Sequence, residues 1–82
     1  MTHESPNGRY TIDCGVDDRR GLFLRVFDRN RMDLGGWPIY DTCALDGLDA
    51  DTFWRMVREF GGPDVLRKVR VEITAARLRA GV

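Results

Sequence analysis

The chain has 82 residues, of which 43% are hydrophobic and 32% charged, and its formal net charge is zero. This length predicts one domain with a thin core, and this composition argues against an intrinsically disordered chain. No apolar run approaches the roughly 20 residues that cross a bilayer, and the N-terminal segment lacks the apolar stretch of a signal peptide. We therefore expect a cytoplasmic protein that makes no contact with a membrane.

The first part of the chain predicts β-strands. Residues 1–8 are expected to form a flexible tail, followed by a single globular domain over residues 9–82. Alternation of apolar and polar residues predicts a first strand over residues 9–14 and a second over residues 21–28. The second strand is apolar on both faces, which is typical of the central strand of a small sheet.

A third strand is expected in or around residues 34–45. Its start should be irregular, because Gly35, Gly36 and Pro38 are residues of bulges and sheet edges. The glycine pair before Trp37 could also bring the backbone close to a ligand, but a bulge is the commoner reason for such a pair.

The clearest helix follows Asp49, a good N-cap residue, with Asp51 in its first turn, where the helix dipole favours an acid. An apolar stripe at helical spacing runs along it and consists of Phe53, Met56, Val57 and Phe60. Gly61 and Gly62 are expected to end this helix, and Pro63 can begin the next one.

Residues 63–82 fit two structures. Val69, Val71 and Ile73 alternate with polar residues, as they would in a strand over residues 67–74. A helix accounts for more of the segment, because apolar residues recur at helical spacing along its length. The prediction is an α+β fold in which a small three-stranded antiparallel sheet is followed by two C-terminal helices; the alternative is that residues 67–74 form a fourth strand.

The sequence provides few groups for catalysis or metal binding. The single histidine, His3, lies in the expected tail, and Cys14 and Cys43 are too far apart for a zinc site of ordinary spacing. Both cysteines are expected to be buried as small hydrophobic residues. No phosphate-binding or nucleophile motif is present. We therefore expect no enzyme, and no catalytic residues, metal or cofactor.

Four acids are clustered between the third strand and the first helix: Asp41, Asp46, Asp49 and Asp51. Turn and capping roles account best for them. Two alternatives remain: an acidic contact patch that imitates nucleic acid, and a site for a divalent cation.

A second apolar line is left over when residues 63–82 are read as a helix. Val71, Ala75, Leu78 and Val82 follow helical spacing opposite the core stripe, with basic residues on both sides. Apolar residues beside arginine, together with surplus aromatics, are typical of protein interfaces. The candidate partner-binding residues are Trp54, Arg67, Arg70, Val71, Arg77, Leu78, Asp49 and Asp51.

These features predict a small non-catalytic protein–protein interaction domain, an inhibitor or adaptor that occupies the surface of a protein partner and could also form a homodimer. Many phage-encoded inhibitors, anti-CRISPR proteins among them, belong to this size class, although no motif supports that link. The alternative is a nucleic-acid-binding accessory protein, because residues 55–82 hold seven basic and three acidic side chains.

Overall fold

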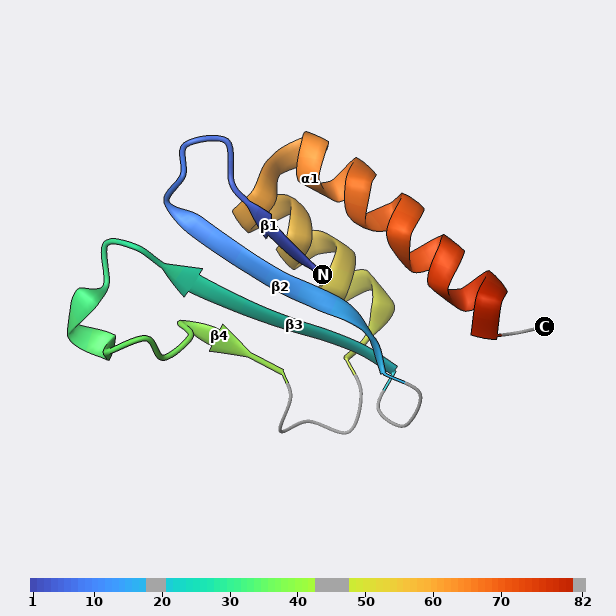
Figure 1. Cartoon of the computed structure of the whole chain (residues 1–82), viewed down its shortest axis with the longest axis horizontal. Coiled ribbons are helices and arrows are strands. Elements are labelled where there is room, and N and C mark those ends of the chain that lie inside the picture. Colours follow the sequence, from blue (N-terminus) through green and yellow to red (C-terminus); the bar gives the residue numbers. More distant parts are fainter. Residues whose placement is uncertain (18–20, 43–47, 81–82) are drawn as a thin grey trace.

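The computed structural model describes residues 1–17, 21–42 and 48–80, which form a four-stranded antiparallel sheet with a C-terminal helix on one face (Figure 1). The strands lie in the order of the sequence. The elements are β1 (Thr2–Glu4), β2 (Tyr10–Asp17), β3 (Gly21–Asp28), the 3₁₀ helix η1 (Met32–Leu34), β4 (Tyr40–Asp41) and α1 (Ala50–Ala80). The predictions of an α+β fold and an antiparallel sheet are confirmed.

Side-chain alternation along β2 and β3 decides which face of the sheet α1 covers. Ile12 pairs with Val26 and Cys14 pairs with Leu24, and all four side chains are buried. Because side chains alternate between the two faces of a strand, these residues share the face against which α1 packs. The buried core consists of Ile12, Cys14, Leu22, Leu24, Val26, Phe53, Val57, Val65, Val69 and Ile73.

The sheet has one more strand than the three predicted from the sequence. The additional strand, β1, lies within residues 1–8, which were expected to form a flexible tail, and places His3 opposite Ile12. His3 Nε2 lies 2.8 Å from a carboxylate oxygen of Glu72, which belongs to α1. Pairing with β2 and the contact with Glu72 therefore position β1. Its three residues are too few to show a strand pattern of their own.

The predicted third strand is reduced to the two residues of β4, which pair with Arg25 and Val26. Before it the chain forms η1 and then two glycines with positive φ, 59° at Gly35 and 92° at Gly36. Since Pro38 has no backbone N–H to give to a ladder, regular pairing is delayed until Tyr40.

The C-terminal region forms one helical element, not two separate helices. It is broken at Gly62, whose φ of 79° and ψ of 179° are accessible essentially to glycine alone. We call residues 50–61 the first arm and residues 63–80 the second arm; in Figure 1 the yellow first arm lies against β2 and the orange-to-red second arm runs back beside it. The alternative strand over residues 67–74 is wrong, because this segment is helical.

Cys14 is buried, as expected, while Cys43 lies outside the described residues. Burial raises the pKa of the Cys14 thiol to about 11, because the thiolate would lose its solvation. We predict that a Cys43→Ser variant, which leaves Cys14 as the single thiol, reacts with iodoacetamide much more slowly when folded than in urea. Equal rates in the two conditions would show that Cys14 is accessible.

Candidate partner-binding surface

Asp49 has a structural role at the start of the first arm. Its Oδ2 accepts hydrogen bonds from the backbone N–H and the hydroxyl of Thr52, both at 3.1 Å, and its carbonyl accepts one from Phe53 N–H at 2.9 Å. The predicted N-cap is therefore confirmed. Asp51 is exposed in the first turn, and Asp46 lies outside the described residues. A partner-binding role for Asp49 and Asp51 stays a prediction.

Trp54 and Arg70, both predicted to bind a partner, contact each other. The Arg70 guanidinium carbon lies 5.5 Å from the centre of the Trp54 ring, which in turn meets the buried Phe53 edge-on at 4.9 Å. This cation–π contact connects the two arms of α1. Trp54 is half-buried, so it serves the packing between the arms and presents only part of its surface to solvent.

Val71 and Leu78 lie on the exposed side of the second arm. They are 67% and 68% exposed, whereas Val69 and Ile73, each two residues from Val71, are buried in the core. Val71 and Leu78 line a shallow groove of about 380 Å³ together with Ala75, Thr74 and Arg70. We call Val71, Ala75 and Leu78 the second-arm strip. The structure thus brings two of the predicted binding residues together on one exposed apolar surface.

Basic side chains lie on both sides of the second-arm strip: Arg67, Lys68, Arg70, Arg77 and Arg79. Arg67 Nη2 donates to Asp64 at 3.0 Å, an exposed pair of small energetic value. Within the part of the chain that the structure describes, Lys68, Arg77 and Arg79 form no ion pair. At these three residues, the rim of the groove therefore carries positive charge that no described carboxylate neutralises.

A second exposed apolar surface lies on the connection from β3 to β4, outside the predicted partner-binding residues. Met32 is 85% exposed and Trp37 is 76% exposed, and both line a hollow of about 470 Å³ whose wall includes Phe27, Gly35 and Gly36. Trp37 directly follows the glycine pair that seemed able to bring backbone near a ligand. That pair was the one indication of this surface in the sequence, and a bulge was the commoner explanation for it.

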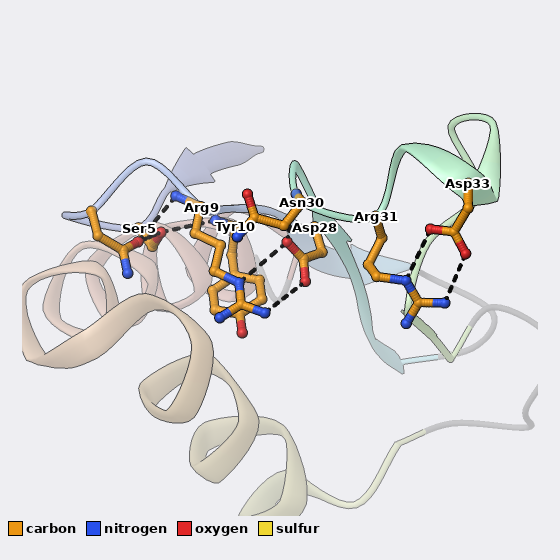
Figure 2. Close-up of polar contacts among 8 residues, drawn as sticks. Ser5, Arg9, Tyr10, Asp28, Asn30, Arg31 and Asp33 are labelled. Carbon is orange, nitrogen blue, oxygen red and sulfur yellow. Dashed lines mark hydrogen bonds and ion pairs between the residues drawn. The ribbon is translucent and has the colours of Figure 1, made fainter.

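The charges beside this hollow are paired within the chain (Figure 2). Asp28 accepts hydrogen bonds from Arg9 at 3.2 and 3.3 Å and from the backbone N–H of Asn30 at 2.9 Å. Arg31 and Asp33 form a two-point pair at 3.1 and 3.2 Å. These contacts fix the β3 end and the start of η1, and they leave little net charge for a ligand to bind.

The hydrogen bonds from Arg9 hold the pKa of the Asp28 carboxyl below its ordinary value of 3.8. An acid whose pKa is lower in the folded chain stabilises the fold above its unfolded-state pKa and loses that contribution as the pH falls through its folded-state pKa. We predict that an Asp28→Asn variant unfolds more easily than the wild type at pH 7 and that the difference shrinks below pH ~4. Urea midpoints across acid pH measure this; a constant difference would contradict it.

Within the described residues, no group of three or more His, Cys, Asp or Glu side chains is placed to hold a metal ion. In the same part of the chain, no helix combines the length and apolar character needed to cross a membrane. Comparison of the chain with protein-family models, with curated proteins and with solved structures found no match.

Proposed function

We propose that this protein is a non-catalytic protein-binding domain that occupies the surface of a protein partner through the second-arm strip. The observation that carries the proposal is the high exposure of Val71 and Leu78, on a helix whose opposite side supplies Val69 and Ile73 to the core. An amphipathic helix in a small domain gains nothing from large apolar side chains in solvent. A partner that covers them gains free energy from the apolar area buried.

The arrangement of the strip resembles a known form of recognition. Val71, Ala75 and Leu78 follow i, i+4, i+7 spacing, the pattern by which helices contact a partner in helix-mediated complexes. The arm that bears them is held to the fold by Val65, Val69 and Ile73 in the core, and its Glu72 contacts His3 of β1. A surface held rigid before binding loses less conformational entropy when a partner arrives.

Two other partners fit less well. A symmetric homodimer through the strip would place the basic rims of two copies against each other, and like charges at an interface are costly. Nucleic acid would use the basic side chains but would leave Val71 and Leu78 without apolar contacts.

A Leu78→Asp substitution tests the proposal. We expect partner binding to weaken by about tenfold or more, since loss of a central apolar contact costs over 1 kcal/mol. Stability should fall by no more than about 1 kcal/mol, because the site is exposed. The measurement is quantitative recovery of bound proteins from a lysate of the source organism, with urea unfolding as the check on the fold.

Met32→Asp is the matched control, because Met32 is also exposed but lies on the other apolar surface. Undiminished recovery by the Leu78→Asp variant would refute binding through the strip. Loss of recovery with Met32→Asp alone would assign binding to the hollow on the connection from β3 to β4. Binding of a short DNA duplex at low salt, with a steep salt dependence, would favour nucleic acid instead.

A further inference from the structure

We infer that the partner contacts the second arm with an acidic amphipathic helix, whose apolar side chains cover Val71, Ala75 and Leu78 and whose carboxylates lie against the basic rim. This inference rests on the proposed function and names the chemistry of the partner at the same site. Its basis is the distribution of charge around the groove, together with the helical spacing of the strip.

Positive charge flanks the strip on both sides. At 100° per residue, Arg70 and Arg77 lie on the side of the first arm, and Lys68 and Arg79 lie on the side of β1. A partner with a single acidic edge would neutralise one side only. A helix with acidic residues on both borders of an apolar stripe matches the two-sided rim, as the charged flanking positions of coiled coils match each other.

The acids of the second arm do not neutralise this rim. Asp64 lies at its start and pairs with Arg67. Glu72 is directed to β1, where its carboxylate contacts His3 at 2.8 Å. Lys68, Arg77 and Arg79 have no carboxylate partner among the residues that the structure describes. Within the described part of the chain, nothing therefore competes with carboxylates of a partner for these three charges.

The dimensions fit a short helix. The basic residues extend from 67 to 79, which is about 18 Å along a helix axis at roughly 1.5 Å per residue. That length corresponds to three to four turns of a partner helix. The groove is shallow and is lined in part by Ala75 and Thr74, whose small side chains allow a second helix to approach closely.

Anionic lipid is the main competing source of negative charge. A helix that lies on a membrane usually presents a broad apolar face with bulky or aromatic side chains. The strip offers one leucine, one valine and one alanine. The bulky core side chains of the second arm, such as Ile73, are committed to the sheet. A narrow apolar line with charge on both sides suits a helix better than a lipid surface.

The test is site-specific photo-cross-linking of the full chain. Benzoylphenylalanine replaces Ala75 within the strip, and in the matched control it replaces Met32. Each protein is irradiated in a lysate of the source organism, and the captured peptide is identified by mass spectrometry. The segment captured from position 75 is expected to carry an excess of Asp and Glu beside apolar residues at helical spacing.

A synthetic peptide of that segment then provides the affinity measurement. Changing its carboxylates to amides should weaken binding to the wild-type chain by about tenfold, since several rim pairs of a few tenths of a kcal/mol each are lost. The Leu78→Asp chain should bind the unmodified peptide more weakly still. Added salt should reduce the difference between the acidic and amide peptides, because screening weakens the rim pairs.

The outcomes separate the two proposals. A captured segment that is neutral or basic, or that comes from a second copy of this chain, overturns the acidic helix but leaves protein binding through the strip intact. Binding of phosphatidylserine vesicles or of a DNA duplex that Arg77→Glu abolishes, without protein capture at position 75, overturns both. Absence of any cross-link specific to position 75 also overturns both.

Discussion

Replacing Ile73 with aspartate is expected to unfold the protein. Ile73 is 1% exposed and belongs to the core with Val69 and Val65. Loss of a buried aliphatic side chain costs about 2–5 kcal/mol, and burial of an unpaired carboxylate adds several more. A domain of this length has a stability of only about 4–12 kcal/mol. The substitution therefore removes most or all of the stability.

Far-UV circular dichroism and urea titration measure this effect. The Ile73→Asp chain should lack a cooperative transition, or should have a midpoint far below that of the wild type. Leu78→Asp provides the matched control on the same arm, with the same introduced charge at an exposed position. A wild-type midpoint for the Ile73→Asp chain would mean that Ile73 lies outside the core.

Replacing Gly61 with valine is the second change with a large expected effect. A Cβ atom at Gly61 would lie 2.7 Å from the Cβ and Cγ1 of Val65 and 2.8 Å from the Cδ1 of Ile12. Val65 and Ile12 are both buried, so neither can move aside freely. Overpacking of a tight core costs about 1–3 kcal/mol, and valine adds two further carbon atoms beyond the colliding one. We expect a loss of roughly 3 kcal/mol or more.

Arg58→Val is the matched control for this change. Arg58 is exposed on the same arm, so the valine there should cost no more than about 1 kcal/mol of helix propensity. Differential scanning calorimetry or urea unfolding of the two variants separates the steric cost from propensity. Similar stabilities for both would show that the close approach of the first arm to Ile12 and Val65 is absent.

The sequence predicted the parts of the fold that depend on local pattern. Alternation in β3 placed Leu22, Leu24 and Val26 on one face, and these are the residues that the structure buries. Asp49 was recognised as an N-cap because its side chain bonds the backbone within its own turn. Helical spacing in residues 63–80 was sufficient to separate Ile73 on the core side from Leu78 on the exposed side.

Features that depend on distant contacts could not be predicted in this way. β1 is a three-residue strand that pairs with residues 11–13 and contacts Glu72, far along the chain. The break of α1 at Gly62 was predicted only in part. Two glycines followed by a proline predict that a helix ends, but they do not give the direction in which the chain continues. The exposure of Trp37 follows from the course of the chain after η1, which no local pattern gives.

The candidate site was predicted in part. Val71 and Leu78 are adjacent on the exposed side of the second arm, as a helix requires. Trp54 and Arg70 were predicted to bind a partner, which stays a prediction, and they also contact each other between the arms. A contact between side chains on different arms leaves no pattern in the sequence. The sequence therefore could not distinguish a residue that contacts the other arm from one that faces only solvent.

The two sides of the second arm are compared by an aspartate scan at Val69, Val71, Ile73 and Leu78. Binding of the captured partner and the urea midpoint are measured for each variant. We expect a division by face: aspartate at 69 or 73 unfolds the chain, whereas aspartate at 71 or 78 leaves the fold intact and weakens binding. If aspartate at 71 and 78 leaves both fold and binding unchanged, the second-arm strip is ordinary solvent-exposed surface and the proposed function is wrong.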